Sequence, residues 1–205
     1  MSLTATAYAP PTPEILRGRL TSAAMVGTQL LGAIIGGLII LRGGRRLSVL
    51  LIGAAIACNS LSGSAPPIWL SHPAIVALAA GMLTIVFNAS AMLFFAFARR
   101  FRFETTGKDG PVLRWIWRGL AILLMTNAVV NVWTDASNIP YPLIGSSYVP
   151  TAALIWSGFA LTFLTLVMGW RDSQGEMRSR YAILLAAISF THDASGLRSD
   201  PQHDQ

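Results

Sequence analysis

Five apolar runs, each long enough to cross or nearly cross a lipid bilayer, decide what this chain can fold into. They cover residues 23–41, 47–64, 75–98, 115–133 and 148–170. A helix rises 1.5 Å per residue, so about 20 apolar residues span a hydrocarbon core of roughly 30 Å. A backbone in lipid must satisfy its own hydrogen bonds, and these runs lack the period-two alternation of strands. The runs therefore predict an all-α fold, a polytopic transmembrane helical bundle with five full spans.

A sixth apolar run is shorter than the others. As a helix, residues 181–190 rise only about 15 Å, which is half of a hydrocarbon core. This partial sixth span fits a segment in the membrane interface, a helix that stops partway, or a longer span cut short in a truncated sensor. We expect three regions: an extracytoplasmic lead over 1–22, disordered or interfacial, the transmembrane bundle over 23–190, and a disordered tail over 191–205.

The composition separates the chain from soluble proteins. Hydrophobic residues make up 53% of it, charged residues only 12%, and the mean hydropathy is +0.56. Soluble domains have about 25% charged residues. The net charge of +6 could suggest nucleic acid, but most basic residues stand near the ends of the apolar runs. Such positions are typical of membrane-flanking charge, so the expected partner is the lipid bilayer and not a nucleic acid.

Basic residues occupy alternate connections between the runs. The links 65–74 and 134–147 contain no Lys or Arg. By the positive-inside rule the three basic links lie in the cytoplasm, which places the amino terminus outside in a multi-pass protein of the bacterial inner membrane. Arg17 and Arg19, before the first run, favour the opposite orientation but are outnumbered. The residues that decide the topology, beside Lys108 and Arg114 in the middle link, are Arg42, Arg45, Arg46, Arg99, Arg100, Arg102, Arg171, Arg178 and Arg180.

A polar stripe runs along the fourth apolar run. Asn127, Asn131 and Asp135 are spaced four residues apart and therefore share one face of a helix. Asn88 in the third run and Gln29 in the first are candidate partners. Polar side chains within a membrane face the interior of the bundle, where this stripe either lines a path or pocket for a small molecule or forms hydrogen bonds between helices.

Small residues recur at a spacing of four in the first two runs. Gly32 and Gly36 form a GxxxG pattern, and Gly53 and Ala57 repeat it. Such faces let helix backbones approach closely. We expect the first two helices to pack against each other in preference to dimerisation.

No motif for enzymatic chemistry is present. The chain lacks the phosphate-binding GxxxxGK[ST] and GxGxxG patterns, the metal-binding HExxH and CxxC patterns, and the GxSxG nucleophile pattern. His72 has no second ligand at a metal-binding spacing. We therefore expect a protein that is not an enzyme and holds neither a metal nor a cofactor.

Two stretches resemble part of a known family. They are MLFFAFARRFRF at 92–103 and GWRDSQGEMRSRY at 169–181. Spans that end in basic residues and lead through a short polar link into a new span are similar to the membrane-embedded input modules of bacterial sensor histidine kinases. The resemblance covers about residues 81–190 and implies a sensor that passes helix movements to a cytoplasmic output domain. The sequence contains no kinase domain, and His192 lies in a short polar stretch, so it is not expected to accept a phosphate.

Together these patterns predict a non-enzymatic sensory or scaffold module that works with a separate cytoplasmic or membrane signalling partner. The alternative is a small-molecule transporter or permease-like protein that uses Asn88, Asn127, Asn131 and Asp135. An ionisable group in mid-membrane, which cation-coupled transporters usually need, is missing from the spans. Oligomeric state does not follow from these patterns.

The orientation can be tested with reporter fusions. We expect green fluorescent protein fused after Lys108 to fluoresce in the cytoplasm and alkaline phosphatase fused after Ile139 to be active outside, because the basic link is retained inside. Swapping the two reporters should abolish both signals. Reporter activity on the same side at both positions would overturn the orientation.

Overall fold

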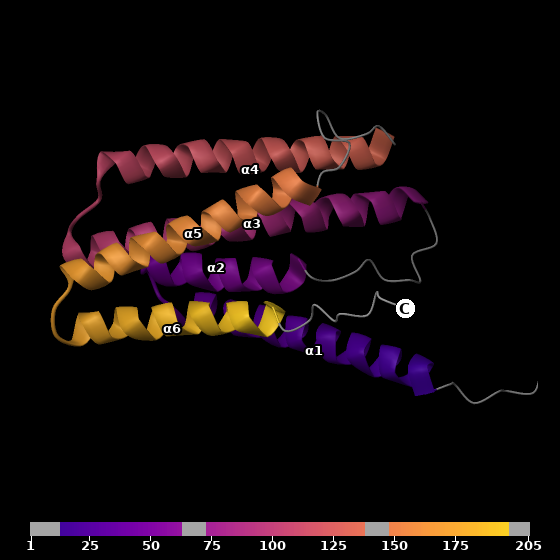
Figure 1. Ribbon diagram of the computed structural model, residues 1–205, viewed down its shortest axis with the longest axis horizontal. Coiled ribbons are helices and arrows are strands. Elements are labelled where there is room, and N and C mark those ends of the chain that lie inside the picture. Colours follow the sequence, from indigo (N-terminus) through magenta and orange to yellow (C-terminus); the bar gives the residue numbers. More distant parts are fainter. Residues whose placement is uncertain (1–12, 63–72, 138–147, 197–205) are drawn as a thin grey trace, which may run out of the picture.

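The computed structural model describes residues 13–62, 73–137 and 148–196, with side chains for 23–61 except 25, for 81–134 and for 149–186. The described residues form six helices and no strand, which confirms the all-α prediction (Figure 1). The helices are α1 (Pro13–Arg42), α2 (Leu47–Ser62), α3 (Pro73–Thr106), α4 (Pro111–Ser137), α5 (Tyr148–Asp172) and α6 (Glu176–Gly196).

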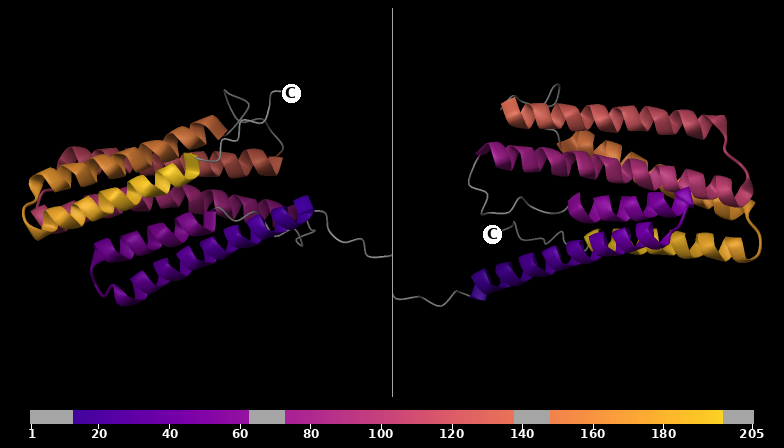
Figure 2. Two further views of the ribbon diagram at one scale, coloured as in Figure 1. Left: turned by 60° about the horizontal axis from the view of Figure 1, so that its bottom comes forward. Right: turned by 180° about the vertical axis from the view of Figure 1, so that it is seen from behind.

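Helix α3 lies at the centre of the bundle. It packs against α2, α4 and α5, while α1 lies along α2 and α6 lies along α5. Successive helices run in opposite directions, as the views in Figures 1 and 2 agree. The buried apolar side chains accordingly come mainly from the central helices, with Phe95, Leu124 and Leu166 among the largest.

Three short links join the helices at one end of the bundle, on the left in Figure 1. Each link contains one glycine with a positive φ angle: Gly44 at 62°, Gly107 at 70° and Gly175 at 57°. Glycine adopts this left-handed conformation without the steric cost of a Cβ atom and so ends a helix in a tight turn. The three links are the basic ones, so the arginines predicted to decide the topology gather at one end. We call it the basic end.

Three helices are long and apolar enough to cross a membrane: Gly81–Thr106 in α3, Pro111–Thr134 in α4 and Val149–Asp172 in α5. The described apolar parts of the first two helices, Val26–Arg42 and Leu47–Leu61, are shorter. At 1.5 Å per residue the 16 residues of α2 rise about 24 Å, less than a hydrocarbon core of roughly 30 Å. The described residues thus support three spanning helices and not the five full spans expected.

Every described helix except α2 extends past the apolar run that predicted it, α1 and α6 among them. Helix α1 begins at Pro13, before the predicted start at Ala23, and α6 continues to Gly196, beyond the predicted end at Phe190. Part of the expected lead and the first six residues of the expected disordered tail are therefore helical. A helix does not have to stop where apolar residues stop, because its backbone hydrogen bonds form equally in polar surroundings, and Pro is favoured in the first helical turn. Residues 1–12 and 197–205 lie outside the described residues.

Two tryptophans mark the length of α4 that suits a bilayer. Trp115 and Trp133 are 69% and 67% exposed. They are 18 residues apart, which is five full turns, so they lie on the same face about 27 Å from each other. Amphipathic indole rings prefer the headgroup level on both sides of a membrane. Their separation and exposure support the predicted role of aromatic residues as interface anchors.

Small residues let two pairs of helix backbones approach closely. A Cβ atom placed on Gly36 of α1 would lie 2.6 Å from the carbonyl oxygen of Gly53 and 2.7 Å from the backbone nitrogen of Ala57, both on α2. In the same way, a Cβ atom on Gly158 of α5 would lie 3.0 Å from the Cβ atom of Ala91 on α3. The prediction that the first two helices pack through their small residues is confirmed.

Substitution of Gly36 should separate α1 from α2. We expect Gly36→Ala to lower the free energy of unfolding by about 1–3 kcal/mol, because the added methyl group meets backbone atoms that cannot move aside cheaply. Gly37→Ala is the matched control, since a Cβ atom there has nothing within 4 Å. Both free energies can be measured by denaturant titration in mixed micelles. Equal effects of the two substitutions would contradict the close contact.

Candidate functional site

The predicted polar residues of the third and fourth runs meet inside the bundle. Asn88 comes from α3 and is fully buried, and Asn127 and Asn131 come from α4 and are each 4% exposed. Thr151, near the start of α5, completes the group through hydrogen bonds to both α4 amides. We call these four residues the amide cluster. It connects the three helices that are long enough to span a membrane.

The hydrogen bonds of the amide cluster cross between all three helices. The side-chain nitrogen of Asn127 donates to Oδ1 of Asn88 at 3.3 Å and to the hydroxyl oxygen of Thr151 at 3.0 Å. The side-chain nitrogen of Asn131 donates to the same hydroxyl oxygen at 2.9 Å. Asn88 itself donates to the backbone carbonyl of Thr84 at 2.9 Å. Double-mutant cycles give such bonds about 0.6 kcal/mol each inside a membrane.

The structure brings together three of the four residues predicted to form this polar face. Asn88, Asn127 and Asn131 lie together as expected, while the side chain of Asp135 lies outside the described residues. Gln29 lies on α1, which packs along α2. Thr151 was missed, although a hydroxyl group one turn into an apolar run, opposite the asparagine stripe, was a usable signal.

One acceptor in the amide cluster remains unused. Oδ1 of Asn131 is buried and has no hydrogen-bond partner among the described residues. Leaving a buried carbonyl group unpaired costs about 1–3 kcal/mol. By contrast, Ser90, Thr162 and Thr165 donate to carbonyl groups of their own helices, as hydroxyl groups in apolar helices commonly do.

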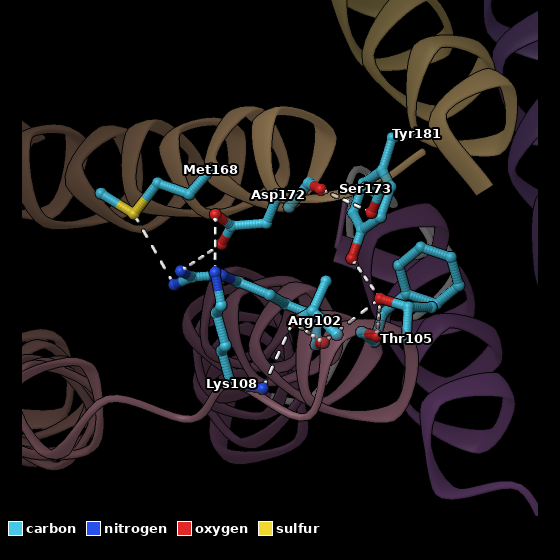
Figure 3. A network of polar contacts seen from close by, with 10 residues as sticks. Arg102, Thr105, Lys108, Met168, Asp172, Ser173 and Tyr181 are labelled. Atoms are coloured by element: carbon cyan, nitrogen blue, oxygen red, sulfur yellow. Dashed lines mark hydrogen bonds and ion pairs between the residues drawn. The ribbon is translucent and has the colours of Figure 1, made fainter. Parts of the chain in front are cut away.

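A second polar network joins the helices at the basic end (Figure 3). Arg102 near the end of α3 donates to the carboxylate of Asp172 on α5 at 2.8 Å, and Lys108 from the link donates to the same carboxylate at 3.1 Å. The guanidinium group of Arg102 also approaches the sulfur of Met168 at 3.8 Å. The last turns of α3 and α5 are therefore held together by ion pairs.

Tyr181 attaches α6 to this network. It is fully buried, and its ring packs edge-on against Phe101 with 4.9 Å between the ring centroids. Its hydroxyl group lies 2.6 Å from that of Thr105, which itself donates to the carbonyl of Phe101. Burial raises the pKa of the Tyr181 phenol. Since the Thr105 hydroxyl donates its hydrogen to the carbonyl of Phe101, it can accept one from Tyr181. Gly169 on α5 leaves room for the ring, because a Cβ atom there would overlap it. We call Thr105, Gly169 and Phe101 the tyrosine socket.

Residues with reactive or metal-binding side chains do not gather. Among the described side chains no group of three His, Cys, Asp or Glu could hold a metal ion. Cys58 is partly buried on α2, and burial among apolar groups makes a thiol less reactive. His72 and the side chain of His192 lie outside the described residues.

Comparison of the chain with models of protein families, with curated proteins and with solved structures finds no match. The resemblance to sensor input modules therefore stays a prediction.

The tyrosine socket makes a testable pair of substitutions. Tyr181→Phe removes one hydrogen bond and should lower the free energy of unfolding by about 1 kcal/mol. Gly169→Ala should cost more, about 1–3 kcal/mol, because the new methyl group forces the buried ring to move. Combined with Gly169→Ala, Tyr181→Phe should then have little further effect. Denaturant titration in micelles measures all three, and additive losses would contradict a shared socket.

Proposed function

We propose that this chain is a non-enzymatic sensory or scaffold module of a bacterial inner membrane, with its amino terminus outside and its basic end in the cytoplasm. In this proposal α3, α4 and α5 form the spanning core, while α1 and α2 lie in the bilayer as a paired hairpin and α6 enters it partway from the basic end, along α5. A separate signalling partner would receive movements of the helices. The positions of the basic links and of Trp115 and Trp133 support this placement.

The observation that carries the proposal is the attachment of α5 at both of its ends. Thr151 binds the two asparagines of α4 near one end, and Asp172 binds Arg102 and Lys108 at the other. These residues are 21 positions apart, so about 32 Å of helix connects the two polar sites. A stiff, packed helix moves as a unit. A displacement of α5 at the amide cluster would therefore reach the basic end, where the ring of Tyr181 on α6 packs against Gly169 of α5.

A transporter is the second candidate, favoured by one observation. The free acceptor of Asn131 is a group that a passing uncharged solute could use. Against this, three hydrogen bonds of the amide cluster join side chains of different helices, which supports a packing role.

Substitution of Asn131 tests the connection between the two ends. Asn131→Leu removes the bond to Thr151, and we expect the basic ends of α4 and α6 to shift relative to each other by about 1–2 Å, as helices do in switching proteins. The shift is measured by electron–electron spin distances between labels at Val112 and Ala182, both exposed, in a Cys58→Ser background. Thr126→Leu is the matched control, because Thr126 is exposed on the same helix.

An unchanged distance distribution in Asn131→Leu would overturn the transmission of movement. Solute entry into vesicles that contain the wild-type chain distinguishes a sensory or scaffold module from a transporter. A module that only transmits movement should admit glycerol and urea no faster than vesicles without protein, as light scattering after osmotic shock would show. Faster entry that Asn131→Leu abolishes would establish the transporter instead.

A further inference from the structure

An arginine on the outer face of α4 has hydrogen-bond donors without a partner among the described residues. The guanidinium group of Arg118 lies over the ring of Trp115, 5.2 Å from its centroid, and both side chains are exposed. No carboxylate of the described residues lies within ion-pair distance of Arg118. Five other arginines of the basic end differ, because ion pairs occupy Arg99, Arg100, Arg102, Arg114 and Arg180.

Stacking on an indole ring fixes a guanidinium group without using its N–H donors. The ring attracts the cation through its face, whereas the five donors lie in the guanidinium plane and point outward. Two parallel donors match two oxygens of a phosphate group, and such charge-assisted bonds are about twice as strong as neutral ones. Arg118 is therefore held in place to bind a phosphate at the level where Trp115 meets the headgroups.

A second cation lies one turn away. Arg114 is four residues before Arg118 and so projects from the same side of α4. Among the described residues, Arg114 has one ion pair, and it is long, with 3.7 Å between its Nε and a carboxylate oxygen of Asp109. The other carboxylate oxygen of Asp109 lies 3.3 Å from Nε of Arg99. The side chain of Arg114 remains 53% exposed. Two cations close together suit a lipid headgroup with net negative charge, since the ammonium group of a zwitterionic headgroup would be repelled.

The surface next to these cations suits an acyl chain. Gly119 follows Arg118 directly, and a Cβ atom there would have nothing within 4 Å, so the helix surface is open. Toward the middle of the helix the exposed side chains become apolar, with Ile122 at 66% and Leu123 at 56% exposure. Along α4, two cations with an indole ring between them are thus followed by an apolar surface. A phospholipid likewise has a charged headgroup followed by an apolar acyl chain.

The charge of the whole basic end favours the same ligand. The segments 42–46, 99–118 and 171–180 contain twelve Lys and Arg against four Asp and Glu. Basic clusters beside membrane spans attract anionic lipids, at about 1 kcal/mol for each cation near the surface. We propose that the α4 face formed by Arg114, Trp115, Arg118 and Gly119 binds one anionic phospholipid, with its phosphate on Arg118 and an acyl chain along Gly119 and Ile122.

Native mass spectrometry of the full chain in mild detergent tests this site. Titration with dioleoylphosphatidylglycerol should show one lipid bound more tightly than dioleoylphosphatidylcholine. Arg118→Gln should raise the apparent Kd for phosphatidylglycerol about five- to tenfold. Arg118→Lys should raise it less, since it keeps the charge but loses the two parallel donors. Arg180→Gln removes an equal charge from the same end and is the matched control. It should raise the Kd much less, because the Arg180 cation is already paired with Glu176.

Gly119→Leu distinguishes a lipid from a soluble phosphate. It fills the open surface without changing charge, so it should weaken phosphatidylglycerol binding, and inorganic phosphate at 10 mM should not compete. Equal affinities of Arg118→Gln and Arg180→Gln would overturn the site. Displacement of the lipid by inorganic phosphate, with no effect of Gly119→Leu, would show a soluble-anion site and overturn the lipid. Thermal unfolding in the same detergent checks that each variant is folded.

Discussion

A polar group inside hydrocarbon must find its hydrogen-bond partner within the protein, and the arrangement of α3, α4 and α5 follows from this requirement. Asn88, Asn127 and Asn131 are buried between the helices and bind one another or Thr151. This orients one face of each helix inward. The remaining faces are rich in exposed apolar side chains, as suits helices that face lipid.

Close packing of small residues also holds the helices together. Lipid tails are as apolar as leucine, so helices in a membrane associate by fitting their surfaces together rather than by hydrophobic burial. The small-residue contacts of Gly36 with α2 and of Gly158 with α3 bring backbones close enough for this. The same principle recurs at the basic end, where Gly169 admits the ring of Tyr181. Gly36, Gly158 and Gly169 are thus packing residues, whereas Gly44, Gly107 and Gly175 serve the turns.

The two ends of the bundle use different chemistry because their surroundings differ. Neutral amides bind one another within the spanning helices, where charge would be costly. Ion pairs and arginines stacked on aromatic rings occur at the basic end, which the proposed placement puts at the level of water and headgroups. The proposed sensory role needs both sites and the stiff α5 between them. The proposed lipid site needs only the outer face of α4, so either proposal can fail without the other.

The sequence by itself determined the all-α class, the alternation of basic and neutral links and the inward polar stripe, because these follow from helix period, bilayer thickness and charge. The number of full spans was overestimated, because an apolar run can continue past the end of its helix, as it does at the end of α2. Only the tertiary structure decided the partners: Thr151 for the asparagines, Asp172 for Arg102, and the socket of Tyr181. Those residues are 20, 70 and 76 positions apart from the groups they bind, and local periodicity holds no information on which distant faces will meet.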